Sequence, residues 1–143
     1  ADLQAFVKGA GAPPGGGDPG KGDPGGILPY GECGVLAPGK ALGVNESVTS
    51  CDGRFTLIQQ DDGNLVLYMN GVGALWATGT DKTAATVTVM QEDGNLVVYT
   101  GEGKPLWDSH TWGNDGAWLA VQDDGNLVIY SSKAIWASGT DGY

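Results

Sequence analysis

The chain has 143 residues, including 26 glycines and 7 prolines, and its 17 acidic and 7 basic residues give a net charge of −10. Glycine costs about 1 kcal/mol at a helix position, so the composition argues against a long helical protein. No run approaches 18 apolar residues, which excludes a transmembrane helix. The negative charge also argues against nucleic acid and anionic lipid as partners. These limits favour a small, turn-rich β protein.

The N-terminal part of the chain differs in composition from the rest. Residues 1–26 hold 9 of the glycines and 4 of the prolines, which predicts a tether without a core. We expect an arm and tether over residues 1–34 and a folded domain over residues 35–143. Asp2–Lys8 has apolar side chains at every second position, Leu3, Ala5 and Val7, which is a short strand-like pattern. The arm is therefore an unstructured leader, folds back on its own domain, or docks onto a neighbouring subunit to form a homo-oligomer or polymer.

The two cysteines, Cys33 and Cys51, lack C-x-x-C spacing, and the only histidine is His110. These facts favour a disulfide over free thiols or a metal site. The chain begins with Ala1 rather than methionine, as it would after removal of a signal peptide. A secreted or cell-surface protein without a metal or cofactor is expected.

One nine-residue motif occurs three times at a constant step of 31 residues. The copies are Gln60–Tyr68, Gln91–Tyr99 and Gln122–Tyr130, and each reads Gln-(Asp/Glu)-Asp-Gly-Asn-Leu-Val-x-Tyr. A tryptophan follows each copy, at Trp76, Trp107 and Trp136. Repetition at a fixed period indicates three structural units that share one core.

Each unit is predicted to form antiparallel strands. In the first, Phe55–Gln60 and Asn64–Tyr68 are joined through Asp-Gly, a strong hairpin signal. A short strand follows at Leu75 and Trp76, and a segment near Leu42–Val48 is expected to supply a fourth. Because strand side chains alternate, the residues expected to point inward with the three tryptophans are Leu65, Leu67, Leu96, Val98, Leu127 and Ile129. Three such sheets that pack their apolar faces around one axis form a three-sided prism.

The outward face of each motif repeats five residue types without exception. These candidate site residues are Gln60, Asp62, Asn64, Val66 and Tyr68; Gln91, Asp93, Asn95, Val97 and Tyr99; and Gln122, Asp124, Asn126, Val128 and Tyr130. Turn formation accounts for the Asp-Gly pair but not for the repeated Gln, Val and Tyr. A carboxylate, two amides and a phenol beside one aliphatic patch suit the hydroxyls and C–H face of a sugar.

The Gln-x-Asp-x-Asn-x-Val-x-Tyr pattern resembles that of the bulb-type, or monocot-type, mannose-binding lectins over about residues 35–143. The resemblance implies a β-prism II fold of three four-stranded sheets, with one α-mannose pocket on each. It also implies that Asp and Asn hold the axial O2 of mannose, Gln holds O3, Tyr holds O4, and Val packs on the ring. All fifteen positions match this pattern.

The chain departs from the plant members of that family in three ways. Gly63 stands where they carry a cysteine in the first motif, so a Cys33–Cys51 bridge would instead hold the N-terminal segment. His110 replaces the small or amide residue found after the tryptophan in the other units, and we interpret it as a loop residue. The N-terminal arm has no plant counterpart, and dimerisation by exchange of C-terminal strands is not assumed.

The sequence also bears on three other functions. An enzyme is disfavoured because no Ser-His-Asp or Cys-His set is evident and Asp61 and Asp62 are neighbours in sequence. A calcium-binding loop would need alternating ligands before Gly63 and a distant Glu, and neither is present in the sequence, so calcium binding is disfavoured. An extracellular filament subunit, with the prism as building block and the arm as connector, stays open as the alternative function. Asn45-Glu46-Ser47 is also a glycosylation sequon.

Overall fold

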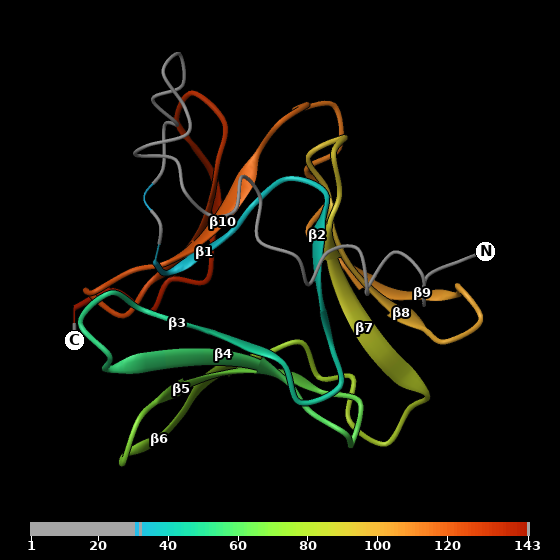
Figure 1. Cartoon of the computed structure of the whole chain (residues 1–143), viewed down its shortest axis with the longest axis horizontal. Coiled ribbons are helices and arrows are strands. Elements are labelled where there is room, and N and C mark those ends of the chain that lie inside the picture. Colours follow the sequence, from blue (N-terminus) through green and yellow to red (C-terminus); the bar gives the residue numbers. More distant parts are fainter. Residues whose placement is uncertain (1–30, 32, 143) are drawn as a thin grey trace.

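The computed structural model describes residue 31 and residues 33–142. The expected tether and its docking strand lie almost wholly in residues 1–30, outside the described residues. Twelve strands in the described part form three four-stranded antiparallel sheets around a common centre (Figure 1). This arrangement confirms the predicted all-β prism. No helix in this part of the chain is long and apolar enough to cross a membrane.

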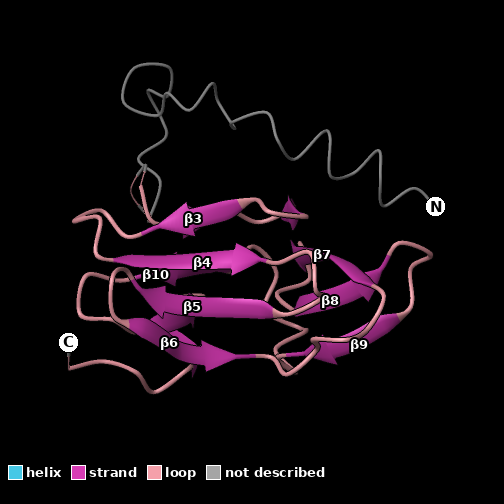
Figure 2. Cartoon of the chain, turned by 90° about the horizontal axis from the view of Figure 1, so that it is seen from below, coloured by secondary structure: helices cyan, strands magenta, loops and turns pink. Residues whose placement is uncertain are grey.

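Each repeat supplies three consecutive strands of one sheet. The first repeat forms β4 (Phe55–Gln59), β5 (Leu65–Met69) and β6 (Gly73–Ala77). The second forms β7 (Ala85–Met90), β8 (Leu96–Thr100) and β9 (Pro105–Asp108). The third forms β10 (Trp118–Val121), β11 (Leu127–Tyr130) and β12 (Ala134–Ala137). Figure 2 shows the first of these sheets face on, with β4, β5 and β6 side by side below β3.

The fourth strand of every sheet comes from the segment before the repeats. β1 (Val35–Leu36) pairs with β10, β2 (Lys40–Gly43) with β7, and β3 (Ser47–Thr49) with β4. The expected single strand near Leu42–Val48 is therefore wrong. A turn interrupts it, where Asn45 has a φ of 67° and the Gly43 N–H donates to Glu46 Oε1 at 2.7 Å. One short segment thus contacts all three sheets and closes the prism (Figure 1).

The predicted disulfide is confirmed, because Cys33 and Cys51 are bonded and bracket this closing segment. Next to Cys51, the Asp52 carboxylate accepts hydrogen bonds from the Arg54 backbone N–H and the Arg54 side chain. These bonds hold the pKa of Asp52 well below its usual range. The Asp52 N–H donates to Asp123 Oδ1 at 3.0 Å, and Arg54 donates to the Asp123 carbonyl at 2.6 Å. The end of the segment is thereby attached to the turn of the third repeat.

The core lies on the prism axis, as the two-residue alternation predicts. Side chains from the middle strands of the three repeats are fully buried there, namely Leu65, Leu67, Leu96, Val98, Leu127 and Ile129. Trp76, Trp107 and Trp136 pack against this cluster and against one another edge to face, with ring centroids 5.4–5.9 Å apart. Every sheet therefore contributes one side to a shared aromatic contact.

One buried polar contact links the first two sheets. The Thr88 hydroxyl on β7 donates to Gln59 Oε1 on β4 at 2.6 Å, and both side chains are fully buried. Thr88→Val preserves shape but leaves a buried amide oxygen without this donor. We expect it to lower the unfolding free energy by about 1–3 kcal/mol, measured by urea denaturation. Thr49→Val, at an exposed position of β3, is the control and should stay within about 0.5 kcal/mol of the wild type. Equal effects of the two changes would contradict the assignment.

Candidate functional site

The three motifs occupy equivalent places in the three sheets. Each begins at the turn after the first strand of its repeat and runs along the second strand, β5, β8 or β11. Gly63, Gly94 and Gly125 have φ values of 97°, 94° and 92°, a region that favours glycine. A Cβ at Gly94 would also lie 2.4 Å from the Asn114 carbonyl oxygen. The Asp-Gly-Asn turns therefore hold the flanking side chains in the same register in every copy.

The aspartate of each motif lies exposed at this turn. Its Oδ1 accepts a hydrogen bond from the backbone N–H two residues later at 2.9 Å, in the pairs Asp62–Asn64, Asp93–Asn95 and Asp124–Asn126. This bond orients the carboxylate, and its second oxygen keeps acceptor capacity. In the first motif Gln60 Nε2 also donates to Asp62 Oδ2 at 3.2 Å.

The asparagine of each motif has a structural role that the sequence reading missed. Asn64 Oδ1 accepts from Gly79 N at 3.0 Å and from Thr80 N at 3.1 Å, and so fixes the loop after Trp76. Asn126 accepts from Gly139 N and Thr140 N in the same way, and Asn95 accepts from Thr111 N. The signal was present as a recurring Thr/Ser-x-Thr pair after each tryptophan. The threonine of this pair donates to the carbonyl of the motif glycine, in Thr80–Gly63, Thr111–Gly94 and Thr140–Gly125.

Glutamine and tyrosine meet at the other end of each motif. The Tyr68 hydroxyl donates to Gln60 Oε1, whereas Gln91 Nε2 donates to the Tyr99 hydroxyl at 3.0 Å and Gln122 Nε2 to Tyr130 at 2.7 Å. Between the two polar ends, the valines form a floor and are only 2–3% exposed, at Val66, Val97 and Val128. The structure therefore brings the five predicted residues of each motif together on one outer strand face. We call these groups site 1 (Gln60–Tyr68), site 2 (Gln91–Tyr99) and site 3 (Gln122–Tyr130).

Site 2 contains an additional carboxylate. Asp108 Oδ2 accepts from Asn95 Nδ2 at 2.9 Å and contacts His110 Nδ1 at 2.9 Å. Burial opposes the charge on Asp108, but the hydrogen bonds from Asn95 and His110 outweigh it and leave the pKa of the carboxyl below its ordinary value. At Tyr99, burial raises the pKa of the phenol, and the nearby Asp93 and Asp108 carboxylates add to that increase. The Tyr99 phenol therefore keeps its proton at neutral pH.

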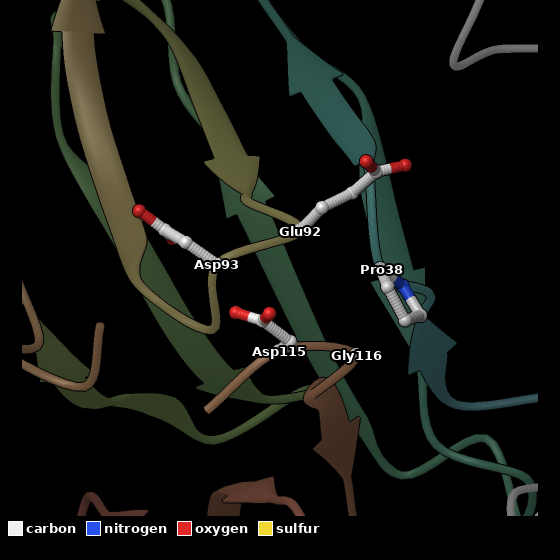
Figure 3. A pocket seen from close by; sticks show the side chains of 5 residues that line it. All are labelled: Pro38, Glu92, Asp93, Asp115 and Gly116. Carbon is white, nitrogen blue, oxygen red and sulfur yellow. The ribbon is translucent and has the colours of Figure 1, made fainter. Parts of the chain in front are cut away.

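Two surface hollows adjoin the sites. One, of about 490 Å³, is lined by Pro38, Glu92, Asp93, Asp115 and Gly116. Figure 3 shows the Glu92 and Asp93 side chains on opposite sides of the turn. Of the five site 2 residues, Asp93 alone lines this hollow. The other hollow, of about 390 Å³, is lined by Trp118, Tyr130 of site 3, Ser131 and Ser132. The Trp118 and Tyr130 rings stack with centroids 5.8 Å apart. The three sites thus share one frame but differ in their surroundings.

Within residues 31 and 33–142, no cluster of His, Cys, Asp and Glu side chains could hold a metal ion.

The prism presents three matched polar sites on its outer strand faces, each with hydrogen-bonding groups at both ends and an aliphatic floor. These features define the class of the protein as a β-prism with three repeated polar surface sites.

Neither the protein-family models nor the curated proteins compared with this sequence match it. Solved structures do match. A monomeric monocot mannose-binding lectin from Gastrodia elata is 44% identical, with 75% of this chain and 97% of that chain covered and a TM-score of 0.68. The snowdrop (Galanthus nivalis) mannose-specific agglutinin, solved with methyl-α-D-mannoside, is 40% identical, with 75% and 96% covered and a TM-score of 0.64. A Marasmius oreades lectin is 31% identical, with 78% and 93% covered and a TM-score of 0.70. The chain belongs to the family of monocot-type mannose-binding lectins.

Proposed function

We propose that this protein is a lectin that binds α-mannose residues of glycans through sites 1, 2 and 3. The observation that carries the proposal is the threefold recurrence of the same five side chains in closely similar arrangements on three separate sheets. The co-crystallised mannoside of the snowdrop relative supports the choice of sugar. In each site the aspartate and asparagine hold the axial O2, the glutamine holds O3, the tyrosine holds O4, and the valine lies under the ring.

The available hydrogen-bonding groups suit this assignment. The exposed aspartate oxygens accept from sugar hydroxyls, and the asparagine Nδ2 lies nearby as a donor. The Tyr99 and Tyr130 hydroxyls, which accept from glutamine, keep their protons for donation, whereas the Tyr68 hydroxyl donates to Gln60 and keeps acceptor capacity. Mannose and glucose differ only in the orientation of O2. A pair of side chains that holds O2 in the axial position therefore distinguishes the two sugars.

A binding role without catalysis is part of the proposal. Asp108 and His110 are in contact, but Ser109 between them is buried and its hydroxyl is shared with Thr111 and Asn95. Ser109 is therefore not placed as the hydroxyl nucleophile that a catalytic triad requires. The lectin identity of the relatives points the same way.

We place the protein outside the cell, as a secreted or cell-surface lectin, because the Cys33–Cys51 disulfide suits an oxidising compartment. An open site with about four or five hydrogen bonds binds a monosaccharide weakly, with a dissociation constant on the order of 1 mM. Three outward sites compensate through avidity on branched or clustered mannose.

The test is a titration of the ¹⁵N-labelled protein with methyl α-mannoside, compared with methyl α-glucoside. The mannoside should shift the backbone resonances of all three motifs, with dissociation constants of roughly 1 mM. The glucoside, which presents O2 equatorially, should bind much more weakly. Absence of mannoside-dependent shifts at the motif residues, or equal responses to both sugars, would contradict the proposed function.

A further inference from the structure

Site 2 differs from sites 1 and 3 at three positions of the loop that follows the tryptophan. The loops correspond residue by residue, because Gly113 N donates to the Asp93 carbonyl at 2.9 Å, as Lys82 N does to Asp62 and Gly142 N to Asp124. Where the other two units carry Ala, Gly and Asp, the second unit carries Asp108, His110 and Trp112. The Thr/Ser-x-Thr pair of the loop keeps its residue types in all three units.

These three residues form a continuous row that starts at site 2. Asp108 Oδ2 accepts from Asn95 Nδ2 at 2.9 Å, and the same oxygen accepts from the His110 backbone N–H at 3.2 Å and contacts its ring Nδ1 at 2.9 Å. The His110 ring then meets Trp112 edge to face, with centroids 5.8 Å apart. The row therefore runs from an asparagine of the proposed mannose pocket to an exposed indole.

Fold stability does not account for this row. His110 has a φ of 60°, where the equivalent Gly79 and Gly139 have 76° and 79°. A residue with a Cβ pays on the order of 1 kcal/mol for this left-handed conformation, and glycine does not. Trp112 is 61% exposed and gains little from burial. A strained backbone position that links the proposed binding site to an exposed tryptophan indicates a role in ligand contact.

We propose that Asp108, His110 and Trp112 form an extended subsite, which binds the second sugar residue of an oligomannoside whose terminal mannose occupies site 2. The inference rests on the proposed mannose-binding function. The indole supplies an apolar surface for the C–H face of a neutral hexose, and the carboxylate and imidazole supply partners for its hydroxyls. Sites 1 and 3 carry Ala, Gly and Asp at these positions and lack this subsite. Site 2 therefore prefers oligomannosides over the monosaccharide more strongly than the other two sites do.

The experiment isolates site 2 in the full chain with Asp62→Ala and Asp124→Ala. This protein is titrated with methyl α-mannoside and with α-mannotriose by NMR, and the Trp112 indole N–H resonance serves as the reporter of the subsite. Mannotriose should bind about fivefold more tightly than the monosaccharide, the scale of one aromatic contact, and should shift the indole resonance. Trp112→Asp, which installs the residue found in the other units, should remove most of that preference.

Val72→Asp is the matched control, because it places the same charge at another exposed apolar position, in the turn before β6. It should leave the preference for mannotriose intact. If site 2 binds the monosaccharide but Trp112→Asp does not change the preference, the inference is overturned and the proposed function stands. Loss of methyl α-mannoside binding in the isolated site, with binding retained by the wild type, overturns the inference too. A change in oligomeric state without a change in preference assigns Trp112 to a protein contact, whereas a wild type that binds no mannoside overturns both proposals.

Discussion

Replacing Asp62, Asp93 and Asp124 together by alanine is expected to abolish binding to mannan while the prism stays folded. Each substitution removes an exposed carboxylate that the turn presents at the surface. Each turn loses one hydrogen bond, which the asparagine backbone N–H donates to Asp Oδ1. This bond contributes about 1 kcal/mol to the unfolding free energy. The glycine of each turn and the loop contacts of the asparagine stay in place. Retention on a mannan column reports binding, and far-UV circular dichroism with thermal melting reports the fold.

Other exposed acids provide a control with the same change in net charge. Asp61 and Glu92 precede the aspartates of the first two motifs, and Glu102 lies in the turn after β8; all three are exposed, and none is one of the five residues of a site. In the second unit the side chains of Glu92 and Asp93 point to opposite sides of the turn (Figure 3). Joint replacement of Asp61, Glu92 and Glu102 by alanine should preserve retention on mannan. Equal losses in the two triple variants would assign the effect to total charge and contradict the site.

Much of the fold was predictable because its information is local and repeated. A 31-residue period defines three equal units, and alternation along each second strand determines which residues enter the core. The distribution of β1, β2 and β3 among the three sheets was not predictable in the same way. These strands have two to four residues and belong to no repeat, so their partners depend on long-range pairing.

In the candidate sites, too, local features were predictable from the sequence and long-range contacts were not. The five residue types of each site were evident from their recurrence, since one strand and its turn carry all of them. The use of Asn64 Oδ1 as the acceptor for the loop after Trp76 depends on a neighbouring strand. The contact of Asp108 with Asn95 also joins two strands. Such cross-strand contacts follow from register, which the sequence pattern alone does not specify.

The three sites depend on one shared core. The sites lie on different sheets, yet their strands meet at the Trp76, Trp107 and Trp136 contact on the axis. Each tryptophan also precedes the loop that the site asparagine fixes. A destabilising substitution at the axis should therefore affect all three sites together, whereas a substitution in one turn should affect only the site at that turn.

Trp107→Ala is accordingly expected to destabilise the whole prism. The Trp107 side chain is partly buried against the core. Its removal costs up to about 3–5 kcal/mol, the value for a fully buried tryptophan, and two ring contacts, at 5.6 and 5.9 Å, are lost with it. This is a large part of the roughly 5–15 kcal/mol that holds a domain of this size folded. Urea denaturation followed by circular dichroism measures the loss. During the urea titration, the native motif resonances of all three units, not only those of site 2, should disappear together at one lowered midpoint.

Trp112→Ala separates this effect from the loss of a tryptophan as such, because Trp112 lies five positions further along the chain and is 61% exposed. Its unfolding free energy should stay within about 0.5 kcal/mol of the wild type. A Trp107→Ala variant as stable as Trp112→Ala would show that the axial contact does not hold the sheets together. A variant that loses only site 2 would show that the three units fold independently. Cooperative loss of all sites is the expected outcome, because a four-stranded sheet with one apolar face needs the other two sheets to bury it.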